Sequence, residues 1–209
     1  MGRRILVLIE LCSGLDHITP AISNLGYAGT TTFTLSGTEL YTQLASGSWD
    51  LVVVDEYANN LDSLTMDLLS AHVAAGKPLI FSYWYLASSF PSHALLTQAG
   101  VTVSSDYSTA LPIYRWAPDP LFTTPNAVPD LTTVSDVCGL DGQYADVTTA
   151  TAVAGYTTAD TPNQTALTIS ADDLIILNLF MPQVVSQDAD GDGKQDMVEL
   201  YENELSFLF

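Results

Sequence analysis

The sequence predicts an α/β protein built on an open, doubly wound and mainly parallel sheet, with late antiparallel strands and a C-terminal helix. The first observation is that short runs rich in Val, Ile and Leu alternate with longer amphipathic segments over residues 5–104, a pattern typical of right-handed β–α–β units. The second is size, because 209 residues with 47% hydrophobic content can bury one sizeable core. We therefore expect a single domain over residues 1–209.

The first half of the chain holds the clearest elements. Ile5–Ile9 is a continuous apolar run, as expected for a central parallel strand covered on both faces, and Trp49–Asp55 contains three consecutive valines. Gly26 and Gly76 follow helical segments and predict where these end. The expected strands are Ile5–Ile9, Thr30–Thr34, Trp49–Asp55, Pro78–Tyr83 and Val101–Ser104, and the expected helices are Asp16–Leu25, Gly37–Ala45, Leu61–Ala75 and Ser92–Gln98.

The pattern changes after Ser104. Residues 105–145 hold five prolines and little periodicity, which predicts an irregular excursion over one end of the sheet. Segments rich in Thr, Val and Ala follow, then an apolar run and a terminal segment with apolar anchors. The expected late elements are the strands Ala145–Thr158, Gln164–Ser170 and Asp173–Phe180, and the helix Met197–Phe209.

The charge balance restricts the partners. The chain carries 24 acidic and 5 basic residues, a formal net charge of -19, so phosphate backbones would be repelled and we expect no nucleic acid. No apolar run approaches about 18 residues, so we expect no membrane insertion. Lysine is scarce while Thr, Ser and Ala are abundant, which favours an extracellular surface. A bound divalent cation would relieve part of the self-repulsion.

The most informative motif covers residues 188–199. Acidic residues occupy positions one, three, five, nine and twelve of this stretch and glycine occupies position six, which is the spacing of an EF-hand calcium loop. The expected Ca2+ ligands are Asp188, Asp190, Asp192, Lys194, Asp196 and Glu199. Lys194 would bind through its backbone carbonyl, because we expect its side chain to point outward. A strand precedes the loop and the sequence contains no second loop, so we expect a structural ion at the turn into the last helix rather than a paired sensor.

A second group of candidates lies where the strands end, the edge at which doubly wound sheets bind ligands. Glu10 and Cys12 follow the first strand, and Asp55 and Glu56 follow the third. The acids could form a second cation site or an acid/base pair, but we expect them to be solvated at an exposed edge. Cys12 is the candidate nucleophile. It could form a disulfide with Cys138, or both could be separate buried thiols.

Aromatic and histidine side chains complete the candidates. Tyr83, Trp84 and Tyr85 would line a sugar-binding or peptide-binding surface if exposed, but we expect a half-buried run beneath residues 105–145. The three histidines lie on or beside predicted helices without metal-ligand spacing, so we expect surface or boundary positions for them. They are His17, His72 and His93.

Residues 5–83 carry one resemblance. Glu10 after the first strand and the strand Trp49–Asp55 are similar to a response-regulator receiver, in which Asp55 would take the phosphoacceptor position and Glu10 would lie near an acidic magnesium pair. The second adjacent acid of that family is replaced by Leu11, and its lysine after the fifth strand is absent. The resemblance implies at most a degenerate signalling domain, and we expect Asp55 simply to end a strand.

A second resemblance covers nearly the whole chain. It is carried by Trp49–Asp55, the phrase Ala75-Gly76-Lys77-Pro78-Leu79-Ile80, the late strands Gln164–Ser170 and Asp173–Phe180, and the helix Glu199–Phe209. These features are similar to the class I glutamine amidotransferase-like domains, a flavodoxin-like group common in bacterial surface and secreted proteins. Catalytic members carry a cysteine in a Gly-x-Cys-x-Gly elbow after the fourth strand, and a His and a Glu after a late strand. Phe81–Tyr85 and Met181–Gln183 stand at those places here, so the resemblance implies the fold and argues against amidotransferase activity.

These observations together predict a non-catalytic, calcium-stabilised α/β module of an exported bacterial protein, either secreted, on the cell surface or periplasmic. We expect the module to be part of a larger or signal-cleaved protein, and a protein or carbohydrate partner is left open. The alternatives are a hydrolase or transferase that uses Glu10, Cys12 and Asp55 at the sheet edge, or a degenerate receiver-like signalling domain.

Overall fold

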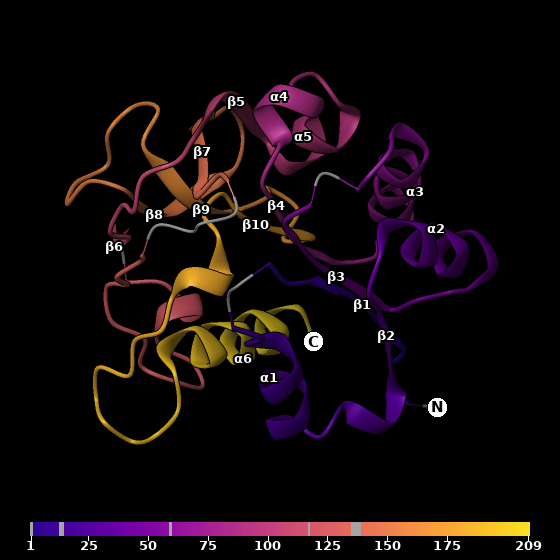
Figure 1. The fold of residues 1–209 in the computed structure, drawn as a ribbon, viewed down its shortest axis with the longest axis horizontal. Helices are drawn as coiled ribbons and strands as arrows, with labels where there is room; N and C mark the ends of the chain where they lie inside the picture. The colour runs from indigo at the N-terminus through magenta and orange to yellow at the C-terminus, as the bar shows by residue number, and fades with distance from the viewer. Residues whose placement is uncertain (1, 13–14, 59, 117, 135–138) are drawn as a thin grey trace.

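The computed structural model describes residues 2–12, 15–58, 60–116, 118–134 and 139–209. Within these residues an eight-stranded sheet runs in the order β2-β1-β3-β4-β10-β9-β8-β6 (Figure 1). The first five strands in this order are parallel, and the last three join antiparallel to their neighbours. These strands are β1 Ile5–Glu10, β2 Thr31–Thr34, β3 Leu51–Glu56, β4 Leu79–Tyr83, β6 Tyr114–Arg115, β8 Thr151–Gly155, β9 Thr165–Ile169 and β10 Ile175–Asn178. The predicted fold class, with late antiparallel strands, is confirmed.

Helices cover both faces of the sheet (Figure 1). Alternate residues of β1 point to opposite faces, so Ile5 and Val7 enter one core while Leu6 and Leu8 enter the other. Helices α1 and α6 close the first core, and α2, α3 and α5 close the second. The helices are α1 Ile18–Asn24, α2 Gly37–Ser46, α3 Ser63–Ala74, α4 Leu86–Ser89, α5 Ala94–Ala99 and α6 Asp196–Leu208. Three short 3-10 helices are η1 Ala28–Thr30, η2 Pro120–Phe122 and η3 Pro182–Val184.

The fifth strand does not continue the parallel sheet. Strand β5, Val101–Tyr107, pairs antiparallel with β7, Gly142–Val147, in a separate two-stranded sheet. The physical reason is visible in its burial, because Val101 and Val103 are buried while residues 102 and 104 are exposed. A strand inside a doubly covered parallel sheet needs burial on both faces, and β10 meets this need with all four residues buried.

The region after residue 104 is more ordered than the proline content indicates. The segment expected to be one strand over Ala145–Thr158 is split, with its start at the end of β7 and its remainder in β8. Residues 105–145 also supply the short strand β6, which extends the main sheet at one edge. Leu121, Phe122 and Val128 from this region are buried beside α6, so the excursion contributes to the core.

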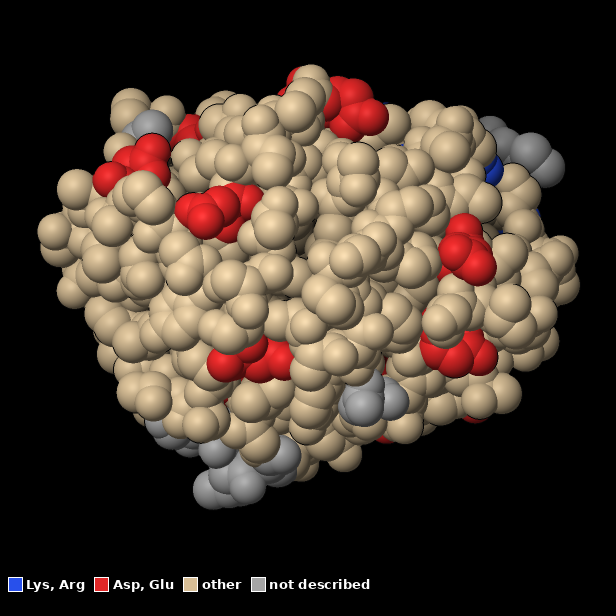
Figure 2. Space-filling model, turned by 90° about the horizontal axis from the view of Figure 1, so that it is seen from above, with Lys and Arg blue, Asp and Glu red and all other residues tan. Residues whose placement is uncertain are grey.

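Acids outnumber bases among the charged residues of the chain, 24 to 5. Figure 2 shows one face on which Asp and Glu are dispersed and Lys or Arg is barely visible. Within the described residues, no helix is both long and apolar enough to cross a membrane.

Candidate functional site

The loop between η3 and α6 projects from the body of the molecule (Figure 1). In it, carboxylate oxygens of Asp188, Asp190 and Asp192 lie within 4.8 Å of one another, and all three residues are exposed. The backbone φ angles of Gly191 and Gly193 are 74° and 90°. Glycine adopts this left-handed conformation at little cost, so the chain can turn sharply enough for the three carboxylates to converge.

Backbone amides hold these carboxylates in place. The Gly191 and Gly193 N–H groups donate to the two oxygens of Asp188, at 2.8 and 3.1 Å. The Asp192 N–H donates to Asp190 at 3.1 Å, and the Lys194 N–H donates to Asp192 at 2.7 Å. Three side chains of like charge are therefore fixed close together. This arrangement costs Coulomb energy unless a cation lies among them, and the oxygen donor set suits a hard cation.

The last two acids of the loop are buried where α6 begins. Asp196 accepts hydrogen bonds from the Gln187 side chain at 2.6 Å and from the Ala189 N–H at 3.2 Å. Glu199 is 5% exposed. Burial raises the pKa of Asp196 and of Glu199, and the charges of the exposed loop aspartates raise them further.

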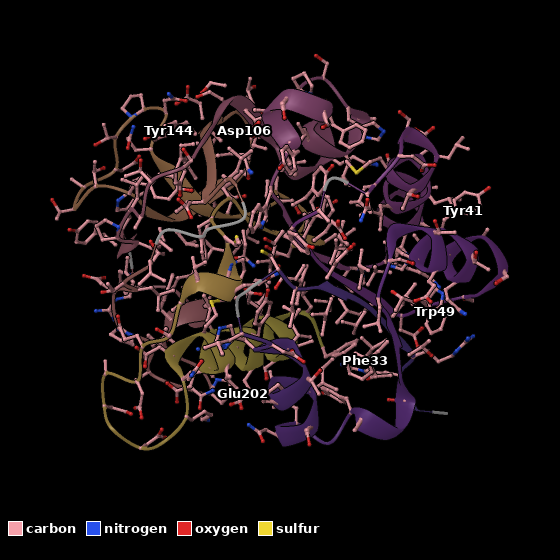
Figure 3. All side chains as sticks on the ribbon, viewed as in Figure 1. Phe33, Tyr41, Trp49, Asp106, Tyr144 and Glu202 are labelled. Atoms are coloured by element: carbon pink, nitrogen blue, oxygen red, sulfur yellow. The ribbon has the colours of Figure 1, made fainter. Side chains whose placement is uncertain are left out.

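Lys194 differs from expectation. Its side chain was expected to point outward, but its ammonium lies 3.0 Å from Glu202 and 3.6 Å from Glu199. It also donates to the Asn126 side chain at 3.2 Å. The reason is the acidity of α6, because an ammonium group gains more from two nearly buried carboxylates than from solvent. Glu202 accepts a further hydrogen bond from Asn24 of α1 at 2.7 Å, and Figure 3 labels it between the two helices.

The acids at the carboxyl edge of the sheet are not solvated, which corrects the expectation for this edge. Asp55 is 2% exposed and Glu56 is fully buried. Burial raises the pKa of Asp55 to about 7 and that of Glu56 to about 8, and the facing Glu10 carboxyl adds to the second shift. Gln183 donates to the Asp55 carboxyl at 3.1 Å and to the Glu10 carbonyl at 2.8 Å. The ends of β1 and β3 are thus covered by η3, a segment far away in the chain.

The aromatic residues at the end of β4, Tyr83 to Tyr85, are mostly buried and do not form an exposed binding surface. Tyr83 and Trp84 are each 1% exposed, so they are more deeply buried than expected, while Tyr85 is half-buried. Trp84 packs with Met181 and Val184 in a small apolar cluster. At the two places that the amidotransferase resemblance singles out, the structure therefore brings a tryptophan and a methionine into contact, and neither can act as a nucleophile or a base.

The structure also places Cys12, the candidate nucleophile, and the three histidines. Cys12 is disulfide-bonded and offers no free thiol, and Cys138 lies outside the described residues. His17 is 2% exposed, so its expected surface position is wrong, and burial lowers its pKa to about 4. The rings of His72 and His93 contact the Pro78 carbonyl and the Asp67 carboxyl, at 3.0 and 3.2 Å.

Four polar residues that the sequence analysis did not single out are fully or almost fully buried near Asp55. They are Asn178, Gln183, Tyr201 and Glu204. A signal for two of them was present, because Asn178 interrupts a strand-like apolar run and Glu204 follows Leu200 by four residues, on the apolar side of the last helix.

Comparison with known proteins identifies the fold. No family model and no curated protein matches the chain. Among solved structures, a glutamine amidotransferase from Methylobacillus flagellatus matches with a TM-score of 0.56 and 8% identity, covering 99% of this chain and 95% of that one. The mmIFT52 N-terminal domain matches with a TM-score of 0.61 and 12% identity, covering 98% and 96%. A β-galactosidase from Rahnella sp. R3 matches with a TM-score of 0.57 and 13% identity, covering 99% of this chain but 31% of that one. The fold is therefore glutamine amidotransferase-like, and at these identities the likeness extends to the fold alone.

Proposed function

We propose that this chain is a non-catalytic α/β module in which a structural Ca2+ ion, bound by residues 188–199, fixes the start of α6. The observation that carries the proposal is the convergence of Asp188, Asp190 and Asp192 above a left-handed Gly193. Ca2+ takes six to eight oxygen ligands. Asp196 and Glu199 would supply further carboxylate oxygens from the first turn of α6, and the Lys194 carbonyl would supply another.

The carboxyl edge supports a role other than catalysis. The disulfide removes the Cys12 thiol, Trp84 and Met181 fill the place after β4 and β10, and Asp55 is almost completely buried. The proposal therefore includes no catalytic nucleophile, and these observations weigh against the hydrolase or transferase alternative.

The setting proposed for the module is an exported bacterial protein. Two observations support it: the surface is acidic and poor in lysine, and a disulfide persists in oxidising compartments. The comparable fold makes up about a third of the β-galactosidase chain, which fits a module within a larger protein. Extracellular calcium modules bind with a Kd of about 0.1–1 mM. A calcium concentration in this range outside the cell would keep the loop filled.

Thermal unfolding with and without calcium tests the proposal. A ligand present at about 100 times its Kd stabilises the folded state by about 2.7 kcal/mol, or roughly 5–10 °C in Tm for a chain of this size. We expect this shift for the wild type, and we expect Asp188→Ala and Glu199→Ala to reduce it. Asp160→Ala is the matched control, since Asp160 is an exposed acid remote from the loop in sequence. Identical melting curves in calcium and in EDTA for the wild type would refute the proposal.

Hydrogen–deuterium exchange tests the structural role itself. Chelation is expected to raise amide exchange in the first turn of α6, because the ion no longer joins the loop to Asp196 and Glu199, and to leave α3 unchanged. Equal exchange in α6 with and without calcium would show that a bound ion does not order this helix.

A further inference from the structure

A row of polar side chains crosses three neighbouring strands beneath α6. Asp55 of β3 is in register with Ser82 of β4, which is in register with Asn178 of β10. The residues two positions earlier on the same strands all belong to the core closed by α1 and α6. They are Val53, Ile80 and Ile176. Because alternate residues of a strand share a face, the polar row lies on this face as well.

The residues that cover this row are polar too. Tyr201 and Glu204 of α6 are both 0% exposed, and Gln183 of η3 is 1% exposed. Tyr201 and Glu204 are three residues apart and so lie on one side of the helix. Burial raises the pKa of Tyr201, and the charges of Asp55, Glu204 and Asp16 raise it further, so its phenol lies in the field of these acids. We call Asp55, Asn178, Gln183, Tyr201 and Glu204 the internal polar cluster.

Hydrogen bonding within the cluster is incomplete. The amide nitrogen of Gln183 donates to Asp55 at 3.1 Å, and that of Asn178 donates to Glu204 at 3.4 Å. Each amide thus points its nitrogen at a carboxyl group, and its oxygen accepts no hydrogen bond from the described residues. Four buried oxygens have no partner in the part of the chain that the structure describes. They are Gln183 Oε1, Asn178 Oδ1, Tyr201 OH and Glu204 Oε1. Buried polar atoms are almost always satisfied, so four such oxygens in one cluster indicate a place where an ion or a water molecule binds.

The charge of the cluster favours an ion. It contains two carboxyl groups, and within the part of the chain that the structure describes, none of the hydrogen bonds or ion pairs of the five Lys and Arg residues reaches it. Burial raises the pKa of Glu204 to about 8 and that of Asp55 to about 7, since neither carboxylate has a cation to offset its desolvation. Two carboxylates balance one divalent charge, and amide and phenol oxygens complete a set of hard donors.

From this geometry we propose a second cation site, in which the internal polar cluster binds one Ca2+ between the sheet and the middle of α6. Carboxylate oxygens of Asp55 and Glu204 bind the ion, and the oxygens of Asn178, Gln183 and Tyr201 supply neutral ligands. The site is separate from the loop of residues 188–199, and it does not depend on that loop binding calcium. Together the two ions would join α6 to the sheet at its start and at its middle.

Metal analysis after refolding tests this site. The wild type and the loop variant Asp188→Ala/Asp192→Ala are unfolded in EDTA, refolded with calcium chloride as the only divalent cation, and dialysed. The loop variant is expected to retain about one calcium per chain, because the internal site has no solvent access and releases its ion slowly. The further change Glu204→Gln is expected to remove that ion.

The controls separate an ion from water and from misfolding. Glu202→Gln, on the same helix but paired with Lys194, is expected to keep the internal ion. Tyr201→Phe removes one oxygen and keeps the ring, so it is expected to lower calcium retention even if Glu204→Gln fails to fold. A loop variant that folds, holds no calcium and melts identically in calcium and EDTA would overturn the internal site. A wild type that holds only the ion removed by Glu204→Gln would instead refute the calcium loop.

Discussion

At the scale of single residues, the calcium loop is shaped by near neighbours in the chain, whereas the carboxyl edge of the sheet is buried by residues far away in the chain. Asp188, Asp190 and Asp192 converge because neighbouring residues dictate the turn. The burial of Asp55 depends on Gln183, which is 128 positions away in the chain. A pattern within one strand carries no information on such a contact, so the sequence alone predicts solvated acids at a strand end.

The burial of His17 also depends on distant parts of the chain, and it predicts how stability changes with pH. Its ring is 2% exposed, and burial lowers its pKa from 6.5 to about 4. In the unfolded chain the ring takes up a proton below about pH 6.5, whereas the folded protein resists protonation until about pH 4. The contribution of the neutral His17 ring to stability is therefore fully present above pH 6.5 and is lost as the pH falls toward 4. The loss from this residue is at most about 3 kcal/mol.

Urea unfolding between pH 4 and 7 checks this contribution. His17→Gln is expected to flatten the acid limb of the stability curve, because the glutamine does not titrate, even if the variant is less stable at pH 7. His93→Gln is the matched control for the loss of a histidine ring, since His93 is half-buried rather than buried, and His17→Gln should flatten the limb more than this control does. An acid limb of equal slope in wild type and His17→Gln would exclude His17 as its source.

At the scale of elements, helix ends follow local chemistry and strand neighbours do not. The third helix was expected at Leu61–Ala75 and runs over Ser63–Ala74, ahead of Gly76 with its φ of 75°. Strand β5 was also expected, but its antiparallel partner β7 starts at residue 142. Capping and glycine signals lie within a few residues of each helix end, whereas the choice between β5 and β10 beside β4 depends on which strand can be buried on both faces.

The cap of α3 gives an element-scale prediction. The Asp62 carboxylate accepts hydrogen bonds from the Thr65 N–H and hydroxyl, both at 2.8 Å, and these bonds lower the pKa of Asp62. Asp62→Ala is expected to lower the free energy of unfolding by about 1 kcal/mol, the usual value of an N-cap. Denaturant unfolding at pH 7 measures it. Ser63→Ala, at the exposed first helical position, should change stability little, and an equal loss in both variants would contradict the capping role.

At the scale of the whole molecule, fold class and charge were both readable from the sequence because they are sums over many residues. The alternation of apolar runs fixes helices on two faces of a parallel sheet, and no single misplaced boundary changes it. Charge behaves in the same way. Most of the 24 acids lack a basic partner simply because the chain has 5 bases. The described residues form ion pairs at Arg115 and Lys194, and at His93 when protonated.

This imbalance predicts that the folded state is stabilised by simple salt. Compaction brings like charges together, and raising the ionic strength shortens the Debye length from about 30 Å at 0.01 M to about 3 Å at 1 M. We therefore expect the Tm to rise steadily with NaCl for protein that has been unfolded and refolded in EDTA, so that neither proposed calcium site is filled. Calcium added at constant ionic strength should then give a further, saturable rise that Asp188→Ala reduces. A Tm that is flat or falls with NaCl would mean that repulsion among the surface acids does not limit stability, and the calcium-dependent rise would then be due to specific binding alone.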